Sequence, residues 1–145
     1  MINCTIDEKK FEVLEKKTIL EVALSNNIEI PYFCYHKKIG IEGSCRMCLV
    51  EIKNSSKLVP SCATMISEGM EIYTTSPAVI KARKGVLEFL LANHPLDCPI
   101  CDKGGECPLQ DYAYIYGQGA SRFTEEKDLG LKHSVLGDHI VYDSE

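Results

Sequence analysis

Two groups of sulfur and nitrogen donors stand out in this sequence of 145 residues, which contains eight cysteines and four histidines. The first group has the spacing C-x10-C-x2-C-x13-C and consists of Cys34, Cys45, Cys48 and Cys62. The second has the spacing H-x3-C-x2-C-x5-C and consists of His94, Cys98, Cys101 and Cys107. Thiolates and imidazoles are the side chains that bind zinc ions and iron–sulfur clusters, so each quartet is a candidate metal site.

The spacing of the first quartet favours an iron–sulfur cluster but leaves zinc open. Structural zinc sites commonly combine two C-x2-C pairs, whereas this quartet has one pair with a lone cysteine on each side. The plant-type two-iron pattern is C-x4-C-x2-C followed by a distant cysteine, and here the first gap is ten residues. Gly40 and Gly43 precede the pair. They let the backbone bend around an inorganic core and direct its N–H groups at sulfides.

The second quartet fits two kinds of site equally well on ligand chemistry. Three thiolates and one imidazole form an ordinary zinc site, and the same donors suit a four-iron cluster in which histidine replaces one thiolate. The alternative for His94 is a helix C-cap or a surface residue, since histidine is favourable in the last turn of a helix. Because that alternative leaves three closely spaced thiols without a fourth ligand, we treat His94 as a candidate ligand.

Composition and charge argue against several classes of function. The formal net charge is −5 at pH 7, which disfavours nucleic-acid binding because phosphate recognition needs a basic surface. The longest apolar run, VLEFLLA, is far too short to span a membrane. The N-terminus lacks a basic segment followed by an apolar one, so no secretory signal is expected. We therefore expect a cytoplasmic location, in which clustered cysteines indicate metal ligands rather than disulfides.

Residues 1–75 are predicted to form a small mixed α/β unit around the first quartet. Alternation in INCTI and FEV predicts a hairpin across the polar DEKK turn. Thr18 and Glu21 form a capping box that starts a short helix, which ends near residues 25–27. CLVEI and KLV predict a second strand pair across the KNSS turn, and MEIYTT predicts the last strand. Cys4 lies on the core face of the first strand and is expected to be a buried apolar residue rather than a ligand.

Residues 76–116 are predicted to form a helical segment around the second quartet. Ser76 as N-cap and Pro77 at the first helical position predict a helix over residues 76–93, which delivers the chain to His94. PLQDYAYIY predicts a second helix directly after Cys107. Residues 117–145 show no clear periodicity and form a weakly patterned tail, which we expect to lead to a missing or separate continuation.

Four motifs resemble one protein family: PYFCYHKKIGIEGSCRMCLVEI, VPSCA, LEFLLANHPLDCPICDKGGECPLQDYAYIYG and SRFTEEK. The family is the N-terminal part of the large iron–sulfur subunit of NADH-quinone oxidoreductase, respiratory complex I. Similar modules occur in NAD-linked hydrogenases, electron-bifurcating iron hydrogenases and NAD-dependent formate dehydrogenases. The resemblance covers residues 1 to about 127, and both ligand spacings fit it. Relatives continue into further four-cysteine clusters, so a fragment, a split subunit or a continuation on another chain is expected.

The resemblance implies an α+β fold in which a β-grasp, ferredoxin-like domain precedes a small helical segment. It implies a 2Fe-2S cluster on the first quartet and a 4Fe-4S cluster, with one histidine and three cysteine ligands, on the second. The expected function is an electron-transfer module with no catalytic residue or substrate site of its own. It would relay single electrons from an NADH-oxidising flavin subunit to further iron–sulfur or acceptor subunits, with only indirect membrane contact. The alternatives are the equivalent module of a hydrogenase or formate dehydrogenase, and a zinc-stapled interaction module.

Several other side chains near the quartets have two interpretations each. His36 either donates to a cluster sulfur or is a solvated loop residue, and Arg46 either offsets cluster charge or faces solvent. Tyr112, Tyr114 and Tyr116 span more than one face of the predicted second helix, which favours packing against a partner.

Overall fold

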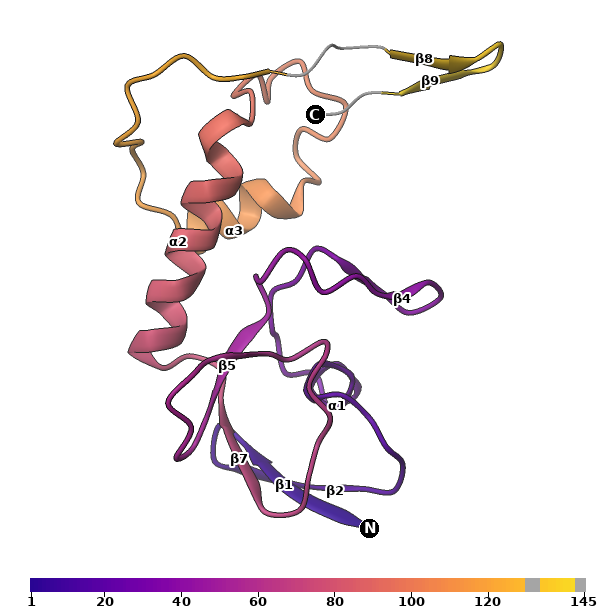
Figure 1. The fold of residues 1–145 in the computed structure, drawn as a ribbon, viewed down its shortest axis with the longest axis vertical. Coiled ribbons are helices and arrows are strands. Elements are labelled where there is room, and N and C mark those ends of the chain that lie inside the picture. Colours follow the sequence, from indigo (N-terminus) through magenta and orange to yellow (C-terminus); the bar gives the residue numbers. More distant parts are fainter. Residues whose placement is uncertain (130–133, 143–145) are drawn as a thin grey trace. The chain divides into compact units, whose positions relative to one another are not determined.

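The computed structural model describes residues 1–129 and 134–142. The chain divides into two compact units, Met1–Val86 and Leu87–Glu145 (Figure 1). This division falls inside a helix, whereas the sequence-based boundaries are at residues 75 and 116. Those boundaries therefore stay predictions.

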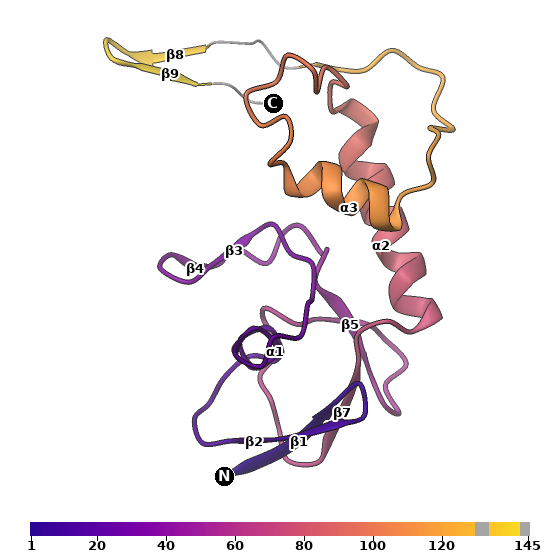
Figure 2. The same cartoon turned by 180° about the vertical axis from the view of Figure 1, so that it is seen from behind.

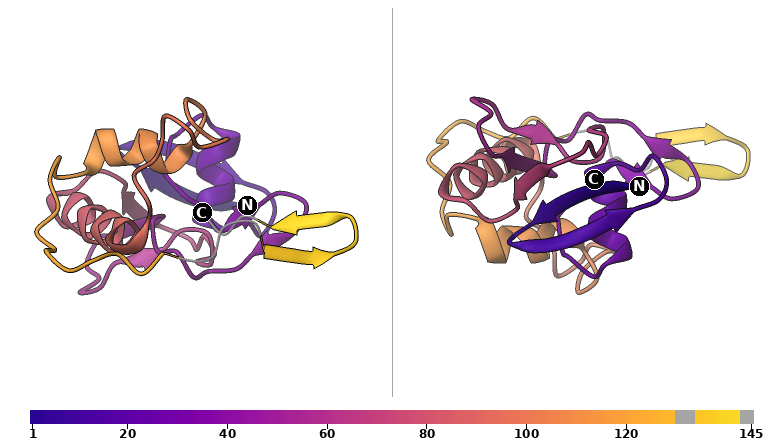
Figure 3. Two further views of the ribbon diagram at one scale, coloured as in Figure 1. Left: turned by 90° about the horizontal axis from the view of Figure 1, so that it is seen from above. Right: turned by 90° about the horizontal axis from the view of Figure 1, so that it is seen from below.

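Unit 1 is built on a five-stranded mixed sheet with the order β2-β1-β7-β5-β6. Its strands are β1 (Ile2–Ile6), β2 (Lys9–Val13), β5 (Leu49–Ile52), β6 (Val59–Pro60) and β7 (Met70–Tyr73). β1 pairs parallel with β7, and the other neighbours pair antiparallel. The β1–β2 hairpin is seen clearly from below (Figure 3, right). The predicted hairpin, second strand pair and last strand are therefore all present.

Helix α1 (Ile19–Ser25) lies beside this sheet, where it is seen end-on in Figure 2. The capping box predicted for it is present: the Glu21 N–H donates to Thr18 Oγ1 at 3.2 Å, and the Thr18 N–H donates to Glu21 Oε2 at 2.8 Å. The core combines apolar residues of the helix and the strands with two of the candidate ligands, Cys48 and Cys62. The combination of a mixed sheet and a helix agrees with the predicted α+β class.

Cys4 is part of the same core and is 3% exposed, as predicted for a buried apolar residue. Burial raises the pKa of its thiol, and the charge of Glu68 raises it further. The neutral thiol is therefore the favoured form at this position.

Two short strands that the sequence did not predict lie in the loop between α1 and β5. They are β3 (Tyr35–His36) and β4 (Gly40–Ile41), which pair antiparallel. Two residues are too few for an alternation pattern to be recognised in the sequence. Their turn returns the chain from Cys34 toward Cys45, and Gly40 adopts a φ of +94° there, which glycine tolerates without steric cost.

Helix α2 (Pro77–Asn93) begins in unit 1 and ends in unit 2. Its start is as predicted, since the Val79 N–H donates to Ser76 Oγ at 3.4 Å. Val79 and Leu87, two members of its apolar stripe, are fully buried. Arg83 lies among the buried residues at 1% exposure, and its Nη2 donates to the Leu49 carbonyl at 3.3 Å.

The register of β5 explains this arginine contact. The Lys53 N–H donates to the Glu71 carbonyl, so every second residue of β5 directs its backbone groups toward β7. Pairing with β7 ends at the Glu51–Tyr73 partners, so the Leu49 carbonyl lies beyond the paired region. The guanidinium of Arg83 supplies the donor that β7 does not, and fixes the first turns of α2 to the strand that follows Cys48.

Unit 2 contains helix α3 (Pro108–Tyr116) and a hairpin of β8 (Ser134–Gly137) and β9 (Ile140–Tyr142). α3 matches the predicted second helix, with Pro108 in its first turn. The hairpin was not predicted, because strands of four and three residues give too short a pattern. No helix among the described residues has the length and apolarity needed to cross a membrane.

Candidate metal centres

In unit 1 the strand pair β5–β6 brings two of the candidate thiols together. The Ser61 N–H donates to the Cys48 carbonyl at 3.0 Å, so Cys48 and Cys62 lie at the same end of the paired strands. Both are 1% exposed. Because the sheet and its core fix the two backbones, this half of the first quartet is preorganised by ordinary protein packing.

The other half of the first quartet lies in the loop that contains β3 and β4. The Sγ atoms of Cys34 and Cys45 are 3.2 Å apart, and the Cys45 N–H donates to Cys34 Sγ at 3.4 Å. The Glu42 N–H donates to the Cys34 carbonyl at 3.1 Å, which closes the loop. Gly43 and Arg46 have positive φ angles of +73° and +60°. This backbone conformation directs N–H groups inward, as in anion-binding loops.

Electrostatics link all four thiols of the first quartet. Burial raises the pKa of Cys62, and a hydrogen bond and the charge of Cys48, with the charges of Cys34 and Cys45, raise it further to about 12. Burial alone would also raise the pKa of Cys34. Hydrogen bonds from Cys45 and Ser44 outweigh that effect and lower its pKa to about 7. The other three thiols thus lie close enough to Cys62 to raise its pKa, and four thiols at this separation can share a cationic cofactor, which would relieve the repulsion.

His36 and Arg46 both lie at the surface of this loop. His36 is exposed, and its Nδ1 accepts the Lys38 N–H at 3.2 Å. Arg46 is also exposed. For both residues the solvent-facing interpretation agrees with the structure.

In unit 2 the four residues of the second quartet line one small pocket. His94 follows the end of α2, Cys98 and Cys101 lie in the turns after Asp97, and Cys107 is the N-cap residue of α3. The three thiols and the histidine are all half-buried. The cavity therefore collects donors from two helix ends and the loop between them.

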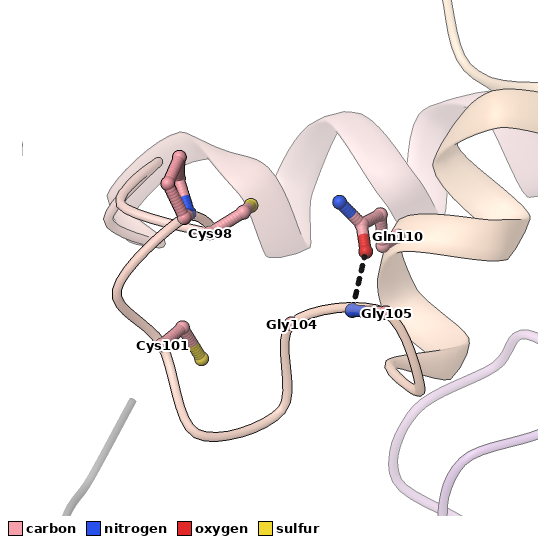
Figure 4. A pocket seen from close by; sticks show the side chains of 6 residues that line it. Cys98, Cys101, Gly104, Gly105 and Gln110 are labelled. Carbon is pink, nitrogen blue, oxygen red and sulfur yellow. Dashed lines mark hydrogen bonds between the residues drawn. The ribbon is translucent and has the colours of Figure 1, made fainter.

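Glycines shape the wall of this second site. A Cβ atom at Gly104 would lie 2.6 Å from the Cys98 carbonyl oxygen and 3.1 Å from that of Cys101. Gly105 has a φ of +87°, and its N–H donates to Gln110 Oε1 at 3.4 Å, which ties the loop to α3 (Figure 4). The Lys103 N–H donates to Cys101 Sγ at 3.4 Å. A close backbone cradle with an N–H group on sulfur fits a sulfur-rich cofactor.

Among the residues that the structure describes, no group of three or more histidine, cysteine or acidic side chains is arranged around a single metal ion. A two-iron cluster with four thiolates needs two protein donors on each iron, and a four-iron cluster needs one on each. Neither cluster therefore requires such a group.

Comparison with protein families identifies the class of the chain. Residues 1–77 match the model of the 2Fe-2S iron–sulfur cluster binding domain, and the chain belongs to that family. Residues 83–122 match the NADH-ubiquinone oxidoreductase-G iron–sulfur binding region, a 4Fe-4S family. The cofactors are thus a 2Fe-2S and a 4Fe-4S cluster, which answers the choice between iron–sulfur and zinc that the spacing left open.

Curated proteins with more than half of their aligned residues identical to this chain include two subunits of NADH oxidoreductases. The chain is 56% identical over 137 residues to a subunit of the NADH-quinone oxidoreductase of Rickettsia prowazekii, covering 94% of the chain and 20% of that protein. It is 54% identical, with the same coverage, to the NADH-ubiquinone oxidoreductase 75 kDa subunit of Reclinomonas americana. The chain thus spans about one fifth of the length of these curated relatives.

A solved structure is also similar. The crystal structure of an NAD+-reducing NiFe hydrogenase in the H2-reduced state contains a chain with 34% identity and a TM-score of 0.79. The match covers 90% of the present chain and 54% of that chain. The predicted resemblance, to the large iron–sulfur subunit and to a hydrogenase module, is confirmed.

Sequence reasoning missed some residues that shape the sites. Ser44 donates to Cys34 through backbone and side chain, and Gly104 packs against two ligand carbonyls. Ser44 carries no signal beyond its place next to Cys45. The pair Gly104–Gly105, inside a loop bounded by cysteines, was a usable signal for a close backbone approach.

Proposed function

We propose that the chain is an electron-transfer module of an NADH-quinone oxidoreductase, with each cluster held by one quartet. In this proposal the 2Fe-2S cluster is bound by Cys34, Cys45, Cys48 and Cys62. The 4Fe-4S cluster is bound by His94, Cys98, Cys101 and Cys107. The observation that carries the proposal is that both quartets assemble within their own unit, each inside a segment matched by an iron–sulfur family.

The side chains of each site have separate tasks in this function. When bound, the clusters accept and release single electrons. Cys48 and Cys62 are buried in the core and keep water from that side of the first site. N–H groups of Ser44 and Cys45 stabilise negative charge on Cys34. At the second site, a neutral imidazole in place of a thiolate removes one negative charge, which by itself raises the reduction potential.

The partners follow from this role. A module with ligand sets closed by protein side chains has no open position for a substrate, so electrons must come from another subunit. We propose that an NADH-oxidising flavin subunit supplies them and that further iron–sulfur or acceptor subunits receive them. The chain would lie in the cytoplasm or at the cytoplasmic side of a membrane, with membrane contact only through these partners.

The second candidate is the equivalent module of an NAD-linked hydrogenase, for which the similarity to the NAD+-reducing NiFe hydrogenase is the specific support. Subunits that co-purify with the chain separate the two. Membrane-arm subunits would support the first, and a hydrogen-activating subunit the second.

The experiment that tests the ligand assignment is anaerobic reconstitution followed by iron and sulfide analysis and EPR of the dithionite-reduced chain. About six irons and six acid-labile sulfides per chain, with two EPR signals, are expected for one cluster of each type. Cys4→Ala is the matched control, since that cysteine lies outside both quartets and alanine places no hydroxyl in the apolar core, so both signals should stay intact. His94→Cys should keep the four-iron signal and lower its potential by adding a negative ligand. Colourless protein with bound zinc would refute the proposal.

A further inference from the structure

Residues 122–128 form a strap that is fastened along the last two turns of α2. Arg122 forms an ion pair with Glu88, with Nε–Oε1 at 2.6 Å and Nη2–Oε2 at 3.0 Å. At the other end, the Asp128 N–H donates to Asn93 Oδ1 at 3.2 Å. Between these two contacts, Lys127 Nζ is directed at the end of the helix. The strap lies in the segment that sequence analysis described as a weakly patterned tail.

The ammonium group of Lys127 donates two short hydrogen bonds to backbone carbonyls at the end of α2. Its Nζ donates to the Leu91 carbonyl at 2.8 Å and to the His94 carbonyl at 2.7 Å. Leu91 is one of the last four residues of α2, whose carbonyls have no partner within the helix. The last turn of α2 contains no basic residue of its own. Lys127 therefore supplies, from 36 positions away, the cation that a helix C-terminus favours.

These two bonds hold the backbone of the candidate ligand His94 as well as the end of the helix. One bond holds the helix and the other holds the carbonyl of His94, so the same ammonium group links the rigid element to the backbone that carries the imidazole. Lys127 is half-buried, which strengthens both bonds relative to an exposed lysine. Holding a long side chain in one conformation costs entropy, which these two charge-assisted bonds offset.

We propose that Lys127 is a positioning residue for His94: it holds the imidazole in place for the four-iron cluster and adds a positive charge beside it. The proposal rests on the ligand assignment made above. Without Lys127 the last turn of α2 can fray, and the histidine becomes the ligand that an external thiol displaces first. The lost charge also makes reduction of the four-iron cluster less favourable.

The test compares Lys127→Met with Lys127→Arg and Lys103→Met in the reconstituted full chain carrying 15N-labelled histidine. Lys103 belongs to the ligand loop, but its Nζ is exposed and pairs only loosely with Glu106 at 3.4 Å. The Lys103 variant thus removes the same charge from the same unit without touching the helix end. Pulsed EPR of the reduced cluster reports the coupling to the histidine nitrogen while 2-mercaptoethanol is added, and a redox titration reports the potential.

Lys127→Met should lose the nitrogen coupling at about a tenfold lower thiol concentration and show a lower potential, because both carbonyls lose a charged donor. Lys127→Arg should behave as the unmodified chain, since a guanidinium can donate to both carbonyls. Thiol sensitivity unchanged in Lys127→Met, or equally increased in Lys103→Met, would overturn the proposal. If Lys127→Met does not retain the cluster, Lys127→Gln, which keeps a donor without the charge, is measured in its place against the same criteria. Absence of nitrogen coupling in the unmodified chain would instead refute the ligand assignment.

Discussion

The two candidate sites are built by different physical means. Cys48 and Cys62 belong to the hydrophobic core of unit 1, at 1% exposure each. In unit 2 all three thiols of the second quartet are half-buried, and no side chain of α3 is fully buried. Half of the first site is therefore set on a packed sheet, whereas the whole of the second is shaped by glycines, hydrogen bonds and the strap.

This difference indicates which part of each site is already folded before the cluster binds. Burial of apolar side chains stabilises unit 1 whether or not the thiols are occupied. The loop of unit 2 has few buried apolar groups to hold it, so binding of its cluster contributes a larger share of its folding free energy. We expect loss of a ligand to damage the two units in different ways.

The largest expected effect is that of Cys48→Ser. The two-iron cluster should be lost, and its EPR signal with it. The buried hydroxyl should also destabilise the cluster-free chain by about 1–3 kcal/mol, since it enters an apolar core. Chemical denaturation followed by circular dichroism measures that cost. Cys45→Ser, at a half-buried position, should also lose the cluster but change the cluster-free stability much less. Equal destabilisation by the two variants would contradict the distinction between core and loop ligands.

Gly104→Ala tests the second site in the same way. The added methyl group would collide with the Cys98 carbonyl at 2.6 Å, and the loop must shift to admit it. Overpacking of this kind costs about 1–3 kcal/mol, and we expect most of the four-iron signal to disappear while the two-iron signal remains. The control is Gly85→Ala, because a Cβ there meets no atom within 4 Å and alanine favours the helix. Retention of the full four-iron signal in Gly104→Ala would show that the cradle is not needed.

Sequence reasoning succeeded where local rules decide the structure. Alternation located β1 and β2, and side-chain capping located the starts of α1 and α2. The spacing of the eight donors identified both quartets, because ligands of one cofactor must be close in space and, in loops, often in sequence. The assignment of those residues as ligands remains a prediction that the proposed experiment tests.

What the sequence could not show depends on contacts between distant residues. The bond from Lys127 to the His94 carbonyl joins residues 33 positions apart, and the Arg83 contact with Leu49 joins residues 34 apart. A lysine in a charged tail and an arginine on a helix both have solvent as their default surroundings. Neither pattern distinguishes them from the exposed lysines and arginines elsewhere in the chain.

The pH dependence of thiol reactivity in the cluster-free chain sharpens the comparison within the first site. The thiolate is the reactive form, so alkylation of Cys34 should rise with a midpoint near its pKa of about 7. Cys62, with a pKa raised to about 12, should stay unmodified at about pH 8. Mass spectrometry after brief iodoacetamide treatment measures both. Cys4 is the control for a buried thiol outside the quartet, since burial and then the charge of Glu68 raise its pKa and it should also stay unmodified. Cys62 reacting as fast as Cys34 would contradict the preorganised pair on β5 and β6.

The smallest expected effect is that of Thr18→Ala, which removes the capping box of α1. It should destabilise unit 1 by about 1 kcal/mol, because the Glu21 N–H loses its acceptor and the Thr18 backbone keeps only part of the reciprocal contact. Ser25→Ala is the matched control: its exposed hydroxyl donates to the Glu21 carbonyl inside the helix, and its loss should change stability by less than about 0.5 kcal/mol. Because α1 packs on the core that buries Cys48 and Cys62, the thermal midpoint of the two-iron absorption should fall in Thr18→Ala while that of the four-iron signal stays fixed. A fall in both midpoints would mean that the two units unfold together. The two sites would then differ in how they are built but not in their thermal stability.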